Sequence, residues 1–310
     1  MEGYRAGRIA IVTGANKGIG YEICKQLVEK GIIVVLTSRD EKRGQEALER
    51  LKKDIDASDC VLFHQLDVAD PASIATLVDF ITNKFGRLDI LVNNAGVPGV
   101  QLEDPILYQE LVEADIRRVS FDELVPEELQ QKALANLDET HELAEQCFQI
   151  NYYGAKRMVE SFIPLLQLSD APRIVNATSN FGKLTLQNSE SVKNILNDTE
   201  SLTEDKLDEV INEFLEHLKE GPIQRKVWPF PFSAYKVSKA SLNAYTRIIS
   251  KKYPEMLINA VCPGYVHTDI TAGTGPLTAK EGAESVVKLA ILPNEGPSGL
   301  FFSRQEVTSF

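Results

Sequence analysis

The chain has 310 residues, of which 43 % are hydrophobic and 25 % are charged, and its formal net charge at pH 7 is -12. These values are ordinary for a soluble globular protein and give room for one large α/β domain or two small ones. No apolar run approaches the roughly 20 residues of a membrane-spanning helix, and no signal or transit segment precedes the first apolar strand, so we expect a cytoplasmic protein without a membrane partner.

The distribution of charge and of cysteine limits the partners further. Residues 101–146 hold 13 acidic and 3 basic residues, and residues 183–228 hold 10 and 6, so the rest of the chain is slightly basic. That remainder can accept an anionic cofactor, whereas the lack of a basic stripe argues against nucleic acid as a partner. The four cysteines are scattered without a C-x-x-C pair, which predicts no metal site and no redox motif.

Short apolar strands and amphipathic helices alternate along the chain. Helices are predicted at 18–29 and 41–53, and a third begins at Pro71. The predicted strands, in chain order, are 9–12, 32–36, 61–63, 88–92, 173–177, 258–261 and a candidate seventh at 299–302. Continuous apolar strands separated by such helices are typical of a parallel sheet that is covered on both faces. The predicted fold class is therefore α/β, a doubly wound, Rossmann-like parallel sheet.

Two long segments interrupt this alternation. Residues 98–143 and 183–231 are too long for loops, and they contain helical patterns at 127–137 and 207–218. Long ordered insertions beside an active site are commonly lids. We therefore expect a single NAD(P)-binding domain over residues 1–310 with two mainly helical insertions.

A glycine-rich segment, Thr13-Gly-Ala-Asn-Lys-Gly-Ile-Gly20, lies between the first predicted strand and the first predicted helix. Gly14, Gly18 and Gly20 permit close approach of the backbone to a pyrophosphate at the N-terminus of that helix. Glycines in this strand–turn–helix context favour a dinucleotide site over a turn without a ligand.

The end of the second predicted strand indicates which dinucleotide is bound. Ser38 and Arg39 stand where an acidic residue would bind the ribose 2′-hydroxyl of NAD, and an arginine there accommodates a 2′-phosphate instead. Lys17 adds a second cation, so we predict NADPH or NADP⁺ as the cofactor. Asp40 would weaken this preference if its carboxylate faced the ribose. Asp67 can either contact the adenine or cap the helix that follows it.

Tyr235 and Lys239 are separated by one helical turn in Ser233-Ala-Tyr-Lys-Val-Ser-Lys239. This spacing places the ammonium group beside the phenol on one helix face. A nearby cation favours the phenolate, so we expect Lys239 to lower the pKa of Tyr235 from its usual value of about 10. Such a tyrosine can exchange a proton with a carbonyl oxygen near neutral pH.

Together these motifs resemble those of the short-chain dehydrogenase/reductases, over essentially the whole chain outside the two insertions. Asn16-Lys-Gly-Ile-Gly20, Phe63-His-Gln-Leu-Asp67 and Cys262-Pro-Gly264 resemble the monomeric carbonyl-reductase-like branch. Within it, Asn151-Tyr-Tyr-Gly154 and Ile163-Pro-Leu-Leu-Gln-Leu-Ser169 resemble the plant menthone/neomenthol, isopiperitenone and salutaridine reductases.

The resemblance implies a catalytic tetrad of Tyr235, Lys239, Ser179 and Asn151, in which Ser179 polarises the substrate carbonyl and Asn151 holds a water molecule in a proton relay. It also implies that the insertion at 183–231 covers the helix face used for dimerisation elsewhere in the family, and hence a monomer. The residues expected to contact NADPH or NADP⁺ are Gly14, Asn16, Lys17, Gly18, Ile19, Gly20, Ser38, Arg39, Asp67, Val68, Asn94, Ala95, Gly96, Tyr235, Lys239, Pro263, Gly264, Val266 and Thr268.

The predicted function is that of an NADPH-dependent oxidoreductase. It would reduce the ketone of a hydrophobic cyclic substrate, such as a monoterpenoid or a related alkaloid, and would oxidise the alcohol in reverse. Position alone suggests an apolar substrate pocket formed by Val97, Phe181, Leu184, Trp228 and Tyr265, with the equal alternative that Trp228 belongs to the core of the second insertion. Three alternatives stay open: a broad-specificity carbonyl reductase, an ene-reductase that acts on an enone, and an NADPH-sensing module without turnover.

Overall fold

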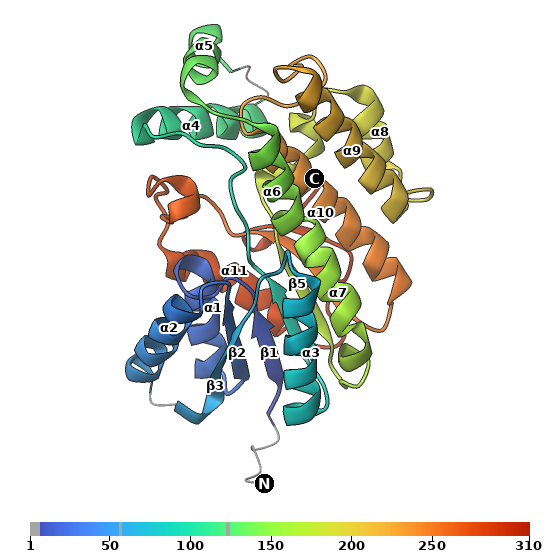
Figure 1. Ribbon diagram of the computed structural model, residues 1–310. Helices are drawn as coiled ribbons and strands as arrows, with labels where there is room; N and C mark the ends of the chain where they lie inside the picture. Colours follow the sequence, from blue (N-terminus) through green and yellow to red (C-terminus); the bar gives the residue numbers. More distant parts are fainter. Residues whose placement is uncertain (1–6, 56–57, 122–124) are drawn as a thin grey trace.

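The structure, a computed structural model, describes residues 7–55, 58–121 and 125–310 (Figure 1). At its centre lies an eight-stranded sheet in the order β3-β2-β1-β4-β5-β6-β7-β8. Neighbouring strands are parallel, except that β8 pairs antiparallel with β7 at one edge. The strands are β1 (Ile9–Val12), β2 (Ile33–Ser38), β3 (Val61–Gln65), β4 (Ile90–Asn93), β5 (Arg173–Ala177), β6 (Leu257–Cys262), β7 (Phe301–Ser303) and β8 (Glu306–Thr308).

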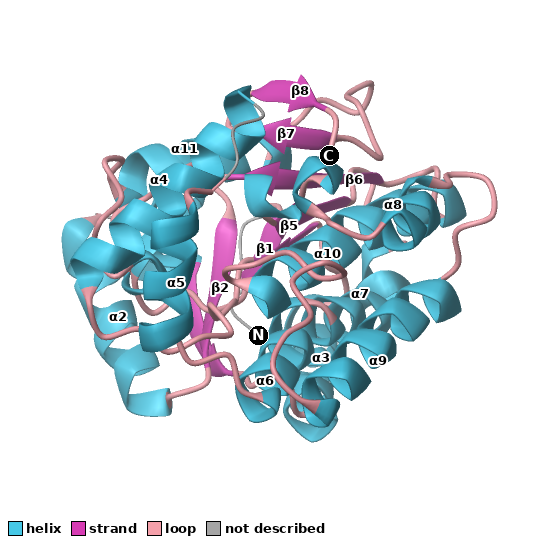
Figure 2. Ribbon diagram, turned by 90° about the horizontal axis from the view of Figure 1, so that it is seen from above, coloured by secondary structure: helices cyan, strands magenta, loops and turns pink. Residues whose placement is uncertain are grey.

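Helices cover both faces of this sheet, as Figure 2 shows. Consecutive strand residues point to opposite faces. Ile9 and Ile11 therefore join the core beneath α3, α7 and α10, whereas Ala10 and Val12 join the core beneath α1, α2 and α11. The predicted doubly wound α/β sheet is thus confirmed. The helices of these two layers are α1 (Gly18–Glu29), α2 (Glu41–Asp54), α3 (Pro71–Phe85), α6 (His141–Asn151), α7 (Tyr153–Leu166), α10 (Ser233–Lys252) and α11 (Ala279–Ala290).

Local sequence explains where the helices begin and end. Asp40 caps α2 by accepting a hydrogen bond from the backbone nitrogen of Arg43, and Asp70 caps α3 in the same way, directly before Pro71. Helix α3 ends at Phe85 and is capped by Gly86, whose φ of 72° lies in the left-handed region that glycine adopts without strain.

The two insertions lie above the carboxyl ends of the strands, at the end of the molecule opposite the N-terminus (Figure 1). The first contains α4 (Pro105–Phe121) and α5 (Glu127–Asn136), and the second contains α8 (Glu190–Asn197) and α9 (Glu204–Glu220). A third apolar cluster forms under the first insertion, separate from the two cores of the sheet. Its members include Leu107, Leu111 and Leu129 from the first insertion and Phe230 and Phe232 from the segment before α10.

The structure differs from the sequence-based expectation mainly at short elements. Strand β8 was not predicted because its three residues are largely exposed and form no apolar run. Helices α4 and α8 were not predicted as separate helices within their insertions. Two short 3-10 turns, η2 (Asn180–Gly182) and η3 (Leu184–Leu186), connect β5 to the second insertion. Within the described residues, no helix combines the length and apolar character needed to cross a membrane.

Candidate active site

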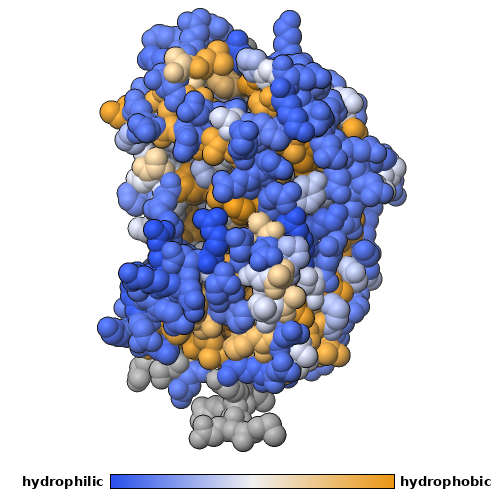
Figure 3. Space-filling model, in the orientation of Figure 1, coloured by the Kyte–Doolittle hydropathy of each residue, from blue (hydrophilic) through white to orange (hydrophobic). Residues whose placement is uncertain are grey.

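A cavity of about 870 Å³ opens at the carboxyl ends of the parallel strands and is bounded on one side by α4. Parallel α/β sheets bind their ligands at this edge, and the volume suits a ligand of cofactor size. Every residue that the sequence predicted to contact the dinucleotide lines this cavity. On the face shown in Figure 3, hydrophilic side chains dominate, and apolar side chains show between the upper helices and the lower body.

We call the part of the cavity lined by the glycine-rich loop and by the residues after β2 the cofactor half. Glycine is required there because backbone segments approach each other closely. A Cβ atom on Gly20 would lie 2.5 Å from Asn94 Nδ2 and 2.6 Å from the carbonyl oxygen of Gly14. Gly14 and Gly18 have φ values of 62° and 56°, in the left-handed region. Asn94 Nδ2 fixes the loop by donating to the carbonyl oxygens of Thr13 at 2.9 Å and Gly14 at 3.2 Å. A pyrophosphate can therefore reach the backbone at the N-terminus of α1.

The residues after β2 form the end of the cavity that would hold the ribose. Asp40 is engaged with its own helix: Oδ1 accepts a hydrogen bond from the Arg43 nitrogen at 2.9 Å, and Oδ2 lies 3.8 Å from Arg43 Nε. Its carboxylate is thus held at the start of α2, while Arg39 is exposed at the cavity wall. Arg43 lines the same wall and was not predicted. Its position four residues after Arg39, at the start of a helix, is the signal that could have identified it.

Asp67 turns its carboxylate toward its own backbone. Its Oδ1 accepts a hydrogen bond from the Ala69 nitrogen at 2.9 Å, and the cap of α3 is Asp70 instead. The alternative that Asp67 caps this helix is therefore wrong, because the capping residue is Asp70, three positions later. Asp67 and Val68 both line the cavity.

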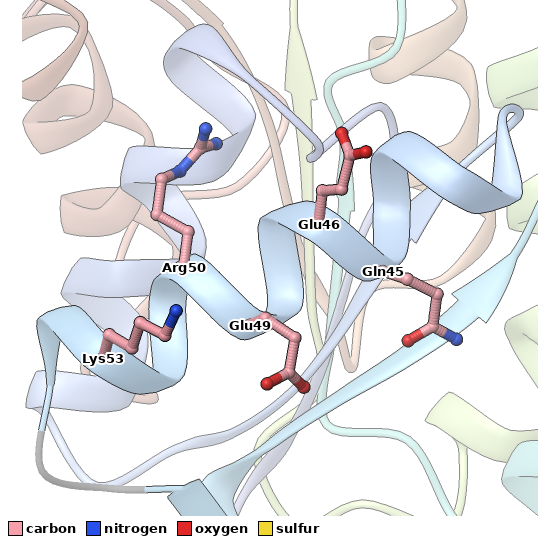
Figure 4. Close-up of a pocket in the computed structure, with 5 residues that line it drawn as sticks. All are labelled: Gln45, Glu46, Glu49, Arg50 and Lys53. Carbon is pink, nitrogen blue, oxygen red and sulfur yellow. The ribbon is translucent and has the colours of Figure 1, made fainter.

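A second hollow runs along α2, and the described residues that line it all belong to that helix (Figure 4). One of them, Arg50, lies over the Tyr21 ring, 4.2 Å from its centroid, and donates a hydrogen bond to the carbonyl oxygen of Asn16 at 3.2 Å. Arg50 therefore braces the glycine-rich loop from outside. We assign no ligand to this hollow.

Three of the four predicted catalytic side chains line the large cavity together: Tyr235, Lys239 and Ser179. Lys239 Nζ lies 5.6 Å from the centroid of the Tyr235 ring and donates a hydrogen bond to the carbonyl oxygen of Ala177 at 2.9 Å. Ser179 follows β5, hydrogen-bonds the Tyr235 side chain and accepts a hydrogen bond from the Phe181 nitrogen at 3.1 Å. A proton donor and a polarising hydroxyl thus converge in the same cavity.

Burial controls the protonation of this group. It raises the pKa of Tyr235 well above the ordinary value of 10.0, with Tyr108 as the next contribution, and the hydrogen bond with Ser179 acts in the opposite direction. Burial also lowers the pKa of Lys239 to about 8. The expectation of a Tyr235 pKa below its usual value is therefore wrong for the protein by itself, because burial of the phenol is the largest contribution and the Lys239 ammonium is not among the groups that oppose it.

Asn151 is buried and lies outside the cavity lining. Its side chain holds the loop that follows β4 through two hydrogen bonds with Val97. Oδ1 accepts a hydrogen bond from the Val97 nitrogen at 2.9 Å, and Nδ2 donates one to the Val97 carbonyl oxygen at 3.0 Å. Nδ2 also lies 3.1 Å from Ser238 Oγ on α10. One lone pair of Oδ1 is left after these contacts.

We call the part of the cavity near Val97, Phe181 and Tyr265 the substrate half. Its lining differs from the sequence-based expectation. Val97, Phe181 and Tyr265 line it as predicted, but Leu184 and Trp228 do not. Trp228 is fully buried in the second insertion, where its Nε1 donates to His217 Nδ1 at 3.0 Å. Leu184 packs against the core beneath α10.

The remaining apolar wall comes from residues that the sequence did not single out. They include Tyr108, Val112 and Ile116 of α4 and Phe232 before α10. The three helical residues recur every fourth position and so share one face of α4. That periodicity was the available signal, but it does not say which cavity the face borders.

Comparisons with known proteins agree with this geometry. The family described as short chain dehydrogenase matches residues 8–121. (+)-Neomenthol dehydrogenase from Capsicum annuum is 56 % identical over 306 residues, with 98 % of each chain covered. The solved structure of menthone neomenthol reductase from Mentha piperita aligns with a TM-score of 0.87 at 52 % identity, covering 97 % of this chain and 100 % of that chain. Salutaridine reductase from Papaver somniferum aligns with a TM-score of 0.82 at 48 % identity, covering 96 % and 99 %.

Proposed function

The chain belongs to the short chain dehydrogenase family and is an oxidoreductase that uses a nicotinamide cofactor, as its motifs predicted, and we propose that it is an NADPH-dependent ketone reductase. The substrate we propose is a hydrophobic cyclic ketone, of the monoterpenoid or alkaloid kind named for its relatives. The observation that carries the proposal is one continuous cavity, polar and glycine-rich at one end and apolar at the other, with Tyr235 and Ser179 in its lining.

The cofactor that we propose is NADPH, whose adenosine ribose carries a 2′-phosphate, in preference to NADH. Arg39 and Arg43 stand together at the ribose end, and the Asp40 carboxylate is held by the N-terminus of α2. Two guanidinium groups can bind a 2′-phosphate with bidentate hydrogen bonds, which a 2′-hydroxyl cannot use. Lys17 lines the same groove and pairs with Asp269 across it, so part of its charge is already compensated.

When bound, NADPH supplies the hydride that adds to the carbonyl carbon. Tyr235 donates its proton to the carbonyl oxygen as negative charge builds there, and its raised pKa keeps that proton in place at neutral pH. Ser179 hydrogen-bonds the same oxygen and so stabilises the developing charge. The Lys239 ammonium, one helical turn away, offsets the charge left on Tyr235.

The raised pKa of Tyr235 affects the rates of reduction and of oxidation differently. Alcohol oxidation needs Tyr235 as a base, so it requires the phenolate that burial disfavours. We therefore expect reduction to dominate near neutral pH and oxidation to gain as the pH rises. Asn151 positions the segment after β4 through Val97, and its remaining Oδ1 lone pair is the place for the relay water that we predict.

The second insertion supports a monomeric enzyme. Helix α9 packs against α6 and α10, and Lys156 of α7 lies 3.0 Å from the Glu204 carboxylate and 3.5 Å from that of Asp208 on α9. Those helix faces are therefore covered within the chain. Sedimentation as a monomer at micromolar concentration is the expected result, and a stable tetramer would contradict it. Localisation in the cytoplasm remains a prediction.

The proposed function is tested by NADPH consumption with menthone, isopiperitenone, camphor and a simple aromatic ketone, with product analysis. Turnover of one or two cyclic ketones to alcohols is the expected result, and Tyr235→Phe should abolish it while NADPH still binds. Activity on the aromatic ketone alone would indicate a broad-specificity carbonyl reductase, and a saturated ketone product would indicate an ene-reductase. Binding of NADPH without turnover of any ketone would favour the sensing module.

A further inference from the structure

A fully buried ion pair connects the first insertion to the helix that carries Tyr235. Lys236 Nζ on α10 lies 2.7 Å from Asp115 Oδ2 on α4, and both side chains are 0 % exposed. Among the described residues, no hydrogen bond of ordinary geometry reaches Lys236 Nζ or either Asp115 oxygen. Each charge is therefore balanced chiefly by the other, with smaller contributions from Arg118 at Asp115 and from Glu139 at Lys236. Burial raises the pKa of Asp115 and lowers that of Lys236, and each partner opposes the shift of the other.

Lys236 also contacts the aromatic wall of the substrate half. Its Nζ lies 5.5 Å from the centroid of the Phe181 ring, within the range of a cation–π interaction. The Phe181 ring in turn stacks on Phe232 at 6.1 Å and meets Tyr235 edge-on at 6.3 Å. The residue directly after the proton donor thus holds the ring that lies beside that donor.

Asp115, the partner of Lys236, lies on α4 beside residues that line the opposite wall of the substrate half. It is the neighbour of Ile116 and lies one turn after Val112, two of the residues through which α4 lines the cavity. Helix α4 packs chiefly on α5, η2 and η3, which belong to the insertions and their connections and not to the sheet layers. The Asp115–Lys236 pair is therefore a direct link between this wall and α10.

A second contact joins the same two parts. Glu139, at the end of the first insertion, accepts hydrogen bonds from Ser233 N and Ser233 Oγ, both at 2.7 Å. These donors lie in the first turn of α10, which has no side-chain cap of its own. The charge of Glu139 also acts on Lys236. The first insertion thus holds α10 on both sides of Tyr235.

We propose that Lys236 is a positioning residue, paired with Asp115, that sets the distance between the substrate wall on α4 and the proton donor Tyr235. The inference rests on the proposed function and deepens it. Two apolar residues could fill the same space, but they would neither hold Phe181 by its π face nor fix one separation of α4 from α10. The pair therefore determines how tightly a ketone is held against Tyr235.

A double-mutant cycle tests this inference in the full chain. The variants are Asp115→Leu, Lys236→Met and the double variant, and the quantities measured are kcat, KM for the ketone, Kd for NADPH and the melting temperature. The apolar pair in the double variant should restore stability, since buried ion pairs are often replaceable by apolar residues of similar size. It should still raise KM or lower kcat by about 10- to 100-fold in total, the cost of misplacing reacting groups by about 1 Å. NADPH binding should be unchanged.

Recovery of the native kcat and KM together with stability in the double variant would overturn the inference, because the pair would then serve folding alone. The matched control is Lys132→Met, which breaks an exposed pair with Glu128 on α5 (3.4 Å) and should change none of these quantities. Tyr235→Phe is measured in parallel. If the native protein reduces no ketone, the proposed function fails; if it does and the double variant matches it, only this inference fails.

Discussion

The two halves of the cavity are held in place by different interactions. In the cofactor half, backbone meets backbone: Asn94 bonds the carbonyl oxygens of Thr13 and Gly14, and Gly20 has no room for a Cβ atom. In the substrate half, side chains of α4 meet Phe181 and Phe232 across an apolar cluster and one buried ion pair.

This difference separates what each half can tolerate. Backbone contacts depend on small residues and on local conformation, so the cofactor half should be sensitive to added volume. Side-chain contacts depend on the identity of each partner, so the substrate half should be sensitive to lost charge and lost aromatic surface. Substrate preference can therefore change without disturbing the cofactor site.

The largest effect should come from breaking the buried pair of the substrate half. Asp115→Ala leaves Lys236 buried without its partner and should lower the free energy of unfolding by about 3–5 kcal/mol. The loss should shrink as the pH rises toward the ordinary lysine pKa, because the neutral amine is less costly to bury. Urea unfolding at several pH values measures it. Glu128→Ala, at an exposed pair, should cost no more than about 1 kcal/mol, and an equal loss in both variants would contradict the prediction.

In the cofactor half, the next largest effect should be on dinucleotide preference. Arg39→Ala removes a charged hydrogen-bond donor from the 2′-phosphate, which is worth about 1.5–3 kcal/mol, and should raise the Kd for NADPH about 10- to 100-fold. The Kd for NADH should stay the same. Fluorescence titration with both dinucleotides measures this, with Lys42→Ala as a charge-matched control on α2 outside the cavity. An equal effect of Arg39→Ala on NADH would show that the arginine does not face the ribose.

Added volume should harm the cofactor half. Gly20→Ala places a methyl group within 2.6 Å of a backbone oxygen and should cost about 1–3 kcal/mol of stability together with weaker NADPH binding. The matched control is Gly221→Ala, where no atom of the described residues beyond the chain neighbours lies within 4 Å of the added carbon. Thermal unfolding with and without NADPH compares the two. Similar melting temperatures would mean that the loop relaxes to accept the methyl group.

Lost aromatic surface should harm only the substrate half. Phe181→Leu removes the ring contacts with Phe232 and Tyr235, which are worth about 0.5–1.5 kcal/mol, and should raise KM for the ketone about 2- to 10-fold. NADPH binding should not change, the mirror image of the Arg39→Ala result. A Phe181 variant with weaker NADPH binding would show that the two halves are coupled.

The smallest effect near neutral pH should come from the charge of Lys239, which lies where the two halves of the cavity meet. The Lys239 pKa of about 8 means that its charge is lost as the pH rises through this value, so kcat for ketone reduction should fall above about pH 8. The reason is that Tyr235 then releases its proton without a cation nearby. A pH–rate profile measures the inflection, and Lys239→Arg should remove it because arginine stays charged. A native profile that stays flat to pH 10 would assign the lysine no electrostatic role.

Several features of the site could be predicted because each depends on residues that are close together in the sequence. A tight turn after the first strand is indicated by Gly14, Gly18 and Gly20. The preference for NADPH is indicated by Ser38 and Arg39, which follow the next strand. Tyr235 and Lys239 share a face by helical geometry alone. The carboxyl ends of parallel strands meet at one edge, so these segments had to come together once the α/β alternation was recognised.

Other features depended on distances that no local pattern encodes. Trp228 and Tyr108 are both aromatic residues of the insertions, yet Trp228 fills a core against Phe214 while Tyr108 lines the cavity. Asp40 could have opposed NADPH binding, but the start of α2 engages its carboxylate.

The amino-acid sequence by itself therefore determined the sheet, the dinucleotide loop and the tyrosine–lysine pair, since each follows from periodicity or spacing within one or two elements. Only the tertiary structure decided the substrate wall, the link from Asp115 to Lys236 and the raised pKa of Tyr235. The physical reason is that burial and cross-chain contact are properties of packed surfaces. Packing brings together residues more than a hundred positions apart, such as Asp115 and Lys236, and the desolvation that results shifts the pKa of a buried group in a way that spacing along a helix does not predict.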